Sequence, residues 1–302
     1  MMRKNILALA LTLVMTAGLF AQSAAEVYAN TSPFEIPVPT ASGTNVSRNA
    51  KAEIDYSNAR YGYVMVRFLD RSAPGVRVII TGPRGTRYQY VLNTNGTWEV
   101  FPLTDGNGRY SIGVFEQITG NRFATANSTE INVTLVNEFA PFLRPNQFVN
   151  FNRNSRVVAR ANEVTQGSTS VIDSVSRVYN WVVDNISYDF QLAATVTSGY
   201  VPDVDAVLAR GMGICFDYAA VMTAMLRSQG IPTQLVIGYA GDIFHAWISV
   251  YSAETGWIND AIWFDGTTWR VMDPTFTSTS NGSEEARAFV GNGQNHRPVS
   301  FH

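Results

Sequence analysis

The sequence predicts an α+β protein in which an antiparallel β-sandwich precedes a domain of helices and antiparallel strands. Short alternating polar and apolar segments fill residues 51–137, and turn residues separate them at intervals of about 8–12 residues. Helical spacing of apolar residues dominates residues 155–230, and apolar strands follow from Thr233. Pro141 and Pro145 mark the boundary between these two patterns.

The first 25 residues predict a secretory signal peptide. Arg3 and Lys4 precede an apolar run over residues 6–20, and the small residues up to Ala25 form a cleavage site. Because the run is short for a membrane-spanning helix, we expect an exported protein of bacterial type. Such a protein is secreted, periplasmic or held at the cell surface, with no membrane insertion after cleavage. Residues 26–50, which are polar and contain prolines, are predicted to be a linker.

Six alternating segments between residues 51 and 137 predict an immunoglobulin-like β-sandwich. This region contains neither histidine nor cysteine. We therefore expect it to bind a cell-surface or cell-wall component, to act as a spacer or to support the second domain. Residues 138–154 are predicted to be a second linker. The expected strands are Tyr63–Leu69, Val76–Thr81, Arg87–Leu92, Thr97–Pro102, Arg109–Gln117 and Glu130–Val136.

Residues 155–302 are predicted to form the second domain. Ser170, followed by Asp173, and Asp203 are expected to cap helices at their N-termini. The tail from Thr277 is rich in Ser, Gly and Asn, so we expect its two histidines to be solvated. Those histidines are His296 and His302. The other expected elements are helices over Ser155–Gln166, Thr169–Asn185 and Asp203–Arg210, and a strand over Thr233–Tyr239.

Cys215, the only cysteine, begins a helix that is apolar on nearly every face and ends at Gly230. The unpaired N–H groups and the dipole at a helix N-terminus favour a thiolate. Thirty residues later, His245 lies in a predicted strand over residues 244–251, and Asp273 ends another strand before Pro274. This order of thiol, imidazole and carboxylate suits nucleophilic catalysis, since a thiol needs a base and the base needs an orienting acid.

Four segments around these residues resemble the transglutaminase-like superfamily, whose members have a papain-like core with a Cys-His-Asp triad. The segments are Gly213-x-Cys215-x-x-Tyr218-Ala219, Met225–Pro232, His245-Ala246-Trp247 and Asp273-Pro274-Thr275. The resemblance covers residues from about 155 to 276. It implies Cys215 as nucleophile, His245 as base and Asp273 as orienting acid. Asp217 and Asp242 are alternative acids that lie nearer in sequence.

Two further residues are candidates at this site. Tyr188 matches a tyrosine that such domains often carry before the cysteine helix, and it is our candidate donor to the oxyanion. Backbone N–H groups at the helix start are expected to supply the rest of the oxyanion site. Trp247 lies on the His245 face of the predicted strand. It is equally expected to line the acyl slot or to pack in the core.

The expected chemistry is acyl transfer or hydrolysis at amide bonds through a thioester. Attack by water makes the protein a peptidase or deamidase, and attack by an amine makes it a cross-linker of peptides or proteins. The alternative is a non-catalytic surface-binding or assembly module. Charged residues are 15% of the chain, the net charge is -2 and basic runs are absent, so nucleic acid is a poor partner. No cofactor and no metal site are predicted.

Overall fold

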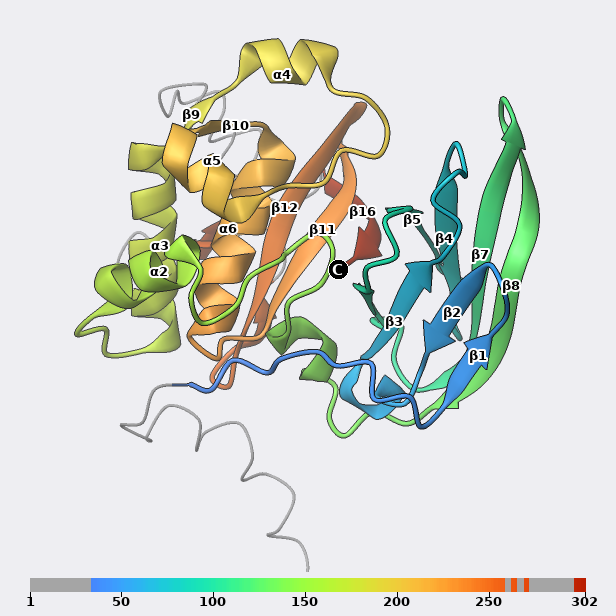
Figure 1. The fold of residues 1–302 in the computed structure, drawn as a ribbon. Coiled ribbons are helices and arrows are strands. Elements are labelled where there is room, and N and C mark those ends of the chain that lie inside the picture. The colour runs from blue at the N-terminus through green and yellow to red at the C-terminus, as the bar shows by residue number, and fades with distance from the viewer. Residues whose placement is uncertain (1–33, 259–261, 265–268, 272–295) are drawn as a thin grey trace, which may run out of the picture. The chain divides into compact units, whose positions relative to one another are not determined.

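The structure is a computed structural model that describes residues 34–258, 262–264, 269–271 and 296–302 (Figure 1). The predicted signal peptide, the predicted acid Asp273 and most of the predicted tail lie outside these residues. Residues 34–302 group into one compact unit, and the domain limits expected from the sequence stay predictions. Among the described helices, none has the length and apolar character that crossing a membrane requires.

The N-terminal half contains two four-stranded antiparallel sheets in the part of the chain that the structure describes. In β4 and β5, alternate residues are buried, which is the period expected for strands with one face on a core. The immunoglobulin-like topology stays a prediction. One sheet has the order β1 (Val46–Arg48), β2 (Ala52–Asp55), β3 (Tyr63–Phe68) and β6 (Glu99–Pro102). The other has the order β5 (Arg87–Leu92), β4 (Val76–Thr81), β7 (Gly108–Thr119) and β8 (Arg122–Val133).

The observed strand limits match the predicted ones where polar and apolar residues alternate regularly. They differ where pairing with a neighbouring strand sets the length of the strand. Strands β4 and β5 have the predicted bounds, whereas β8 begins eight residues before the predicted Glu130. Its pairing with the long strand β7 extends it through polar residues such as Asn127. The structure also places β1 inside the segment expected to be a linker.

Residues 138–154 are largely covered by protein. They include the short 3-10 helix η2 (Ala140–Leu143). The other 3-10 helix that the structure describes, η1 (Ala59–Tyr61), precedes β3. Phe148, Val149 and Phe151 are at most 9% exposed and belong to the same hydrophobic cluster as core residues of both halves. This segment therefore packs as part of the core.

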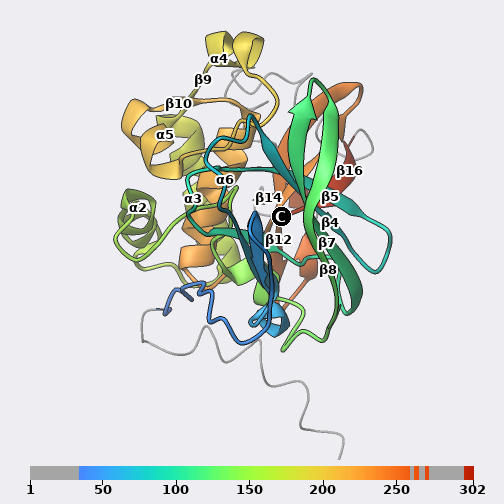
Figure 2. The same cartoon turned by 45° about the vertical axis from the view of Figure 1, so that its right-hand side comes forward.

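The C-terminal half surrounds one buried helix, α6 (Cys215–Ser228). It contacts α2 (Arg156–Thr165), α3 (Val171–Asn185) and α5 (Val204–Arg210). It also contacts β11 (Thr233–Ala240) and β12 (Ile243–Ser252), and both views place it between the helices and this sheet (Figure 2). Every residue from Asp217 to Ser228 is buried, as its apolar sequence predicts.

Strands β11 and β12 are the middle of an antiparallel sheet with the order β13 (Gly256–Ile258), β12, β11 and β16 (His296–Phe301). Two smaller pairs of strands accompany it, and a short helix, α4 (Phe190–Thr195), was not predicted. One pair is parallel, β9 (Ser187–Tyr188) with β10 (Met212–Gly213). The other is antiparallel, β14 (Ile262–Phe264) with β15 (Trp269–Val271).

The expectation that His296 and His302 are solvated was wrong. Their exposed fractions are 9% and 3%. His296 begins β16, which pairs with β11, and the backbone of His302 exchanges hydrogen bonds with Leu235. The polar composition of the tail hid this strand, because the pairing partner lies about 60 residues earlier in the chain.

Candidate active site

The sequence before Cys215 places its thiol at the first residue of α6. Gly211 ends α5 with a φ of +62°, a conformation that suits glycine. Residues 212–213 then pair in parallel with residues 187–188, and Ile214 has an extended backbone. This route brings the chain into the helix at Cys215, so the first N–H groups of α6 lie beside the half-buried thiol.

Asp217 fixes this helix start. Its Oδ2 accepts a hydrogen bond of 2.9 Å from the Ile214 N–H, and its Oδ1 accepts one of 2.7 Å from the Tyr200 hydroxyl. Arg210 Nη2 lies 3.6 Å from Oδ2. A Cβ atom on Gly213 would lie 2.6 Å from the Asp217 Cβ, so glycine is required there. These hydrogen bonds assign Asp217 to the start of α6.

Burial raises the pKa of both groups in the pair of Asp217 and Tyr200. It raises the pKa of the Asp217 carboxyl, and hydrogen bonds from Tyr200 and Ile214 partly offset this shift. Burial also raises the pKa of Tyr200 to about 12, with a further contribution from Asp217. The Tyr200 hydroxyl therefore stays protonated at neutral pH and remains a donor to Asp217.

His245 lies on β12, where its register partner on β11 is Gly238. A Cβ atom on Gly238 would lie 2.3 Å from the Arg297 carbonyl oxygen and 2.6 Å from the Trp247 Cη2. Trp247 is 1% exposed, and its ring stacks 6.3 Å from that of His245. Of the two roles expected for Trp247, the structure shows packing in the core, because its ring fills the space that Gly238 leaves beside His245.

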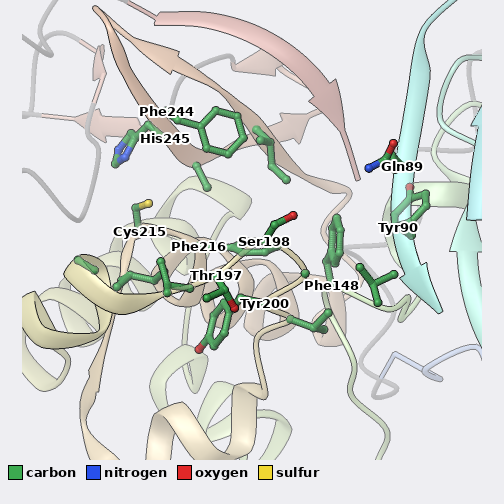
Figure 3. A pocket seen from close by; sticks show the side chains of 18 of the residues that line it. Gln89, Tyr90, Phe148, Thr197, Ser198, Tyr200, Cys215, Phe216, Phe244 and His245 are labelled. Carbon is green, nitrogen blue, oxygen red and sulfur yellow. The ribbon is translucent and has the colours of Figure 1, made fainter. Parts of the chain in front are cut away.

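Cys215 and His245 line the same end of one cavity of about 570 Å³ (Figure 3). They come from different elements, the start of α6 and strand β12. Tyr188 lines the same cavity, and its register partner in the parallel pair is Gly213, two residues before the thiol. The structure therefore brings together three of the five predicted site residues. Of the possible acids, Asp242 is exposed in the turn before β12, and Asp273 lies outside the described residues.

The cavity also has walls that the sequence did not predict. Gln89, Tyr90 and Val91 of β5 line it, together with Phe148 and the loop over residues 196–201. None of these residues belongs to a chemical motif. Their local patterns are those of a half-buried strand and a polar loop, so only the tertiary structure could place them here.

This arrangement suits attack on a carbonyl carbon. A thiolate at a helix N-terminus is a nucleophile, and an imidazole beside it can take its proton and later return a proton to the leaving group. The first backbone N–H groups of α6 have no partner within the helix and can supply donors to an oxyanion. The lining of the cavity is largely aromatic and apolar, so it favours the binding of an apolar ligand group over filling by water.

Comparison with known proteins agrees with this geometry. Residues 158–274 match the family model of the Transglutaminase-like superfamily. The Bacillus subtilis (strain 168) protein YebA is 28% identical over 144 residues, which are 41% of this chain and 19% of YebA. This chain thus spans about a fifth of the length of that relative.

Two solved structures align with parts of this chain. A candidate cysteine protease from Cytophaga hutchinsonii aligns with 15% identity and a TM-score of 0.40, over 86% of this chain and 74% of that chain. Red sea bream transglutaminase aligns with 13% identity and a TM-score of 0.33, over 73% and 49%. The family match covers α6, β11 and β12, the elements that carry Cys215 and His245. Residues 158–274 of this chain are a transglutaminase-like domain.

Proposed function

We propose that this protein is an exported enzyme that transfers or hydrolyses acyl groups at amide bonds of peptides or proteins. The observation that carries the proposal is the position of Cys215 and His245 at the same end of one cavity. The thiol at the start of α6 is the nucleophile and the imidazole is the base. Asp273 is the proposed orienting acid, and Tyr188 is a proposed donor to the oxyanion.

The reaction follows from these roles. His245 takes the thiol proton as Cys215 Sγ bonds to the amide carbon, and the developing oxyanion accepts hydrogen bonds from N–H groups at the start of α6. His245 then protonates the leaving amine, and the C–N bond breaks to give a thioester and the free amine. Attack by water releases an acid, and attack by a second amine forms a new amide.

Alkylation tests the nucleophile directly, because Cys215 is the only cysteine and the protein mass reports on that site alone. With iodoacetamide we expect fast labelling already near pH ~6, as for thiolates at helix N-termini, instead of a rise only toward pH ~8.5. His245→Ala should move the pH profile toward that of an ordinary thiol. Slow labelling that rises only at high pH and does not respond to His245→Ala would refute the enzyme and favour a non-catalytic surface module.

The same assay distinguishes the two remaining acids. Asp273→Ala should shift the labelling profile in the same direction as His245→Ala but by less, because it acts through the imidazole. Asp242→Ala is the matched control, and we expect no shift from this exposed residue. A shift with Asp242→Ala and none with Asp273→Ala would transfer the orienting role to Asp242.

A peptide library identifies the reaction. The protein is incubated with the peptides with and without an excess of a primary amine, and product masses are read. Cleaved peptides indicate a peptidase, conversion of a side-chain amide to an acid indicates a deamidase, and amine-sized mass gains indicate a cross-linker. Cys215→Ala is the control for each product. Unchanged peptides under every condition would contradict the proposed activity.

A further inference from the structure

One wall of the cavity belongs to the N-terminal sheets. Gln89 and Tyr90 lie at the end of the cavity opposite to Cys215 and His245 (Figure 3). On β5, Gln89 and Val91 are exposed, whereas Tyr90 points into the core. A Cβ atom on Gly199 would lie 2.9 Å from Val91 Cγ2, so the loop over residues 196–201 packs closely against this strand. The cavity thus extends from the thiol to the edge strand β5.

Aromatic rings connect these two ends. Phe216 follows Cys215 on α6, and its ring centroid lies 5.1 Å from that of Phe148. The Phe148 ring lies 5.1 Å from the Tyr90 ring, and all three residues line the cavity. We call Phe216, Phe148 and Tyr90 the aromatic row. It forms a continuous line of ring contacts from the residue after Cys215 to β5, and its most accessible ring is that of the half-buried Phe216.

The far end of the aromatic row is firmly held. Tyr90 is 2% exposed, its hydroxyl hydrogen-bonds His302 Nδ1 at 3.0 Å, and its ring also contacts Phe101. Phe148 contacts the His302 ring as well. Because the row is fixed by contacts outside the cavity, a ligand that binds it does not have to order it. Gln89 adds an exposed amide to this end, while Phe244, 63% exposed, lines the end near His245.

We propose that the acyl-side segment of a peptide substrate lies along the aromatic row and contacts Gln89, so that β5 selects substrates that carry a bulky apolar group on this segment, away from the attacked carbonyl. This inference rests on the proposed function, since it takes Cys215 as the nucleophile. The cavity volume of about 570 Å³ is within the range of ligand sites, about 300–1,000 Å³. The apolar rings favour burial of an apolar group, and the Gln89 amide can donate to or accept from the substrate main chain.

Two chloromethyl ketones with the same reactive group test the proposal. One carries a benzyloxycarbonyl-phenylalanyl group and the other an acetyl-glycyl group, and intact mass follows the labelling of Cys215. We expect the phenylalanyl probe to label at least about tenfold faster, the scale on which one apolar contact discriminates substrates. Gln89→Trp should remove most of this advantage by filling the far end of the cavity.

Arg87→Trp is the matched control. Arg87 is exposed on the same strand and face, two residues from Gln89, and it is not among the cavity-lining residues. It should leave both rates unchanged. If Gln89→Trp does not fold, Gln89→Glu against Arg87→Glu repeats the test with a charge in place of bulk. Equal rates of the two probes, or a rate advantage that survives the Gln89 variants, would overturn the proposal.

Failure of the proposed function would look different. In that case iodoacetamide would label Cys215 slowly and without dependence on His245, whichever residue stands at position 89. Fast, His245-dependent labelling by iodoacetamide together with equal rates of the two ketones would keep the enzyme and remove only the role of β5.

Discussion

The two ends of α6 serve different purposes. At its N-terminus, Cys215 is half-buried and borders the cavity. Near its C-terminus, Arg227 is fully buried and donates hydrogen bonds only to backbone carbonyls among the described residues: Thr233 at 2.8 and 2.9 Å, Arg144 at 2.7 Å and His302 at 2.6 Å. One end borders the cavity, and the other is fixed to three separate segments of the chain.

The difference teaches how a reactive helix start can be positioned. An active site needs its groups held within a fraction of an ångström, yet the thiol itself must stay accessible. In α6, hydrogen bonds of Arg227 fix the C-terminal end of the helix. Hydrogen bonds of Asp217 fix the first turn, which carries the thiol. Changes at the two ends should therefore separate cleanly into loss of activity and loss of stability.

The largest expected effect is on activity at the open end. Cys215→Ala should lower turnover of any substrate found by at least about 10⁴-fold, because it removes the nucleophile of a catalytic unit. Its thermal midpoint should stay within a few degrees of that of the wild type, since it removes a single half-buried atom. The measurements are initial rates and thermal unfolding. Retained activity would mean that another group attacks the amide.

A smaller effect, on stability, is expected at the fixed end. Arg227→Met keeps most of the side-chain length but removes the guanidinium donor from the carbonyls of Thr233, Arg144 and His302, of which that of His302 keeps a second donor, the Leu235 N–H. This loss should cost about 2–5 kcal/mol of unfolding free energy. Urea unfolding measures the change. Arg153→Met at an exposed position is the control, with an expected change within about 0.5 kcal/mol. Equal midpoints for both variants would show that these carbonyls find other partners at no cost.

The smallest expected effect concerns pH and His302, which lies beside Arg227. Burial and, to a smaller extent, the positive charge of Arg227 together lower the pKa of His302 to about 3. Below pH 6.5 the unfolded chain binds a proton that the folded protein does not, so stability falls as the pH decreases from 6.5 toward 3.

The fall attributable to this residue should be about 1–2 kcal/mol between about pH 6.5 and 5. It is obtained from urea unfolding as the difference between the wild type and His302→Gln, a variant that does not titrate. His302→Gln should therefore lose less stability on acidification. Parallel pH profiles for the two proteins would exclude His302 as a source of acid sensitivity.

Sequence patterns were sufficient where local chemistry decides the structure. The helix after Cys215, the caps at Ser170 and Asp203, and the strand that carries His245 all follow from periodicity and capping. These elements define the reactive end of the cavity. The matching triad position Asp273 stays a prediction.

The opposite wall could not be predicted, because it depends on contacts between distant segments. Nothing in the sequence of β5 indicates that Gln89 shares a cavity with Cys215, about 125 residues later. Strand β16 was missed for a related reason. It contains Pro298, which is tolerated because β16 is an edge strand of its sheet, and its pairing partner β11 decides its structure.

The position of β16 has a consequence for folding kinetics. It pairs with β11, Thr104 Oγ1 donates to the Phe301 carbonyl across 197 residues, and the ring of His302 reaches Tyr90 across 212 residues. To form contacts so distant in sequence, the chain must first lose the entropy of closing a long loop, and the stabilising contact energy is gained only afterwards. Such contacts therefore slow folding. The helix that carries the thiol can form before these contacts do. The cavity is therefore expected to be complete only after these contacts form, so refolding should regain the fast labelling of Cys215 more slowly than it regains helix.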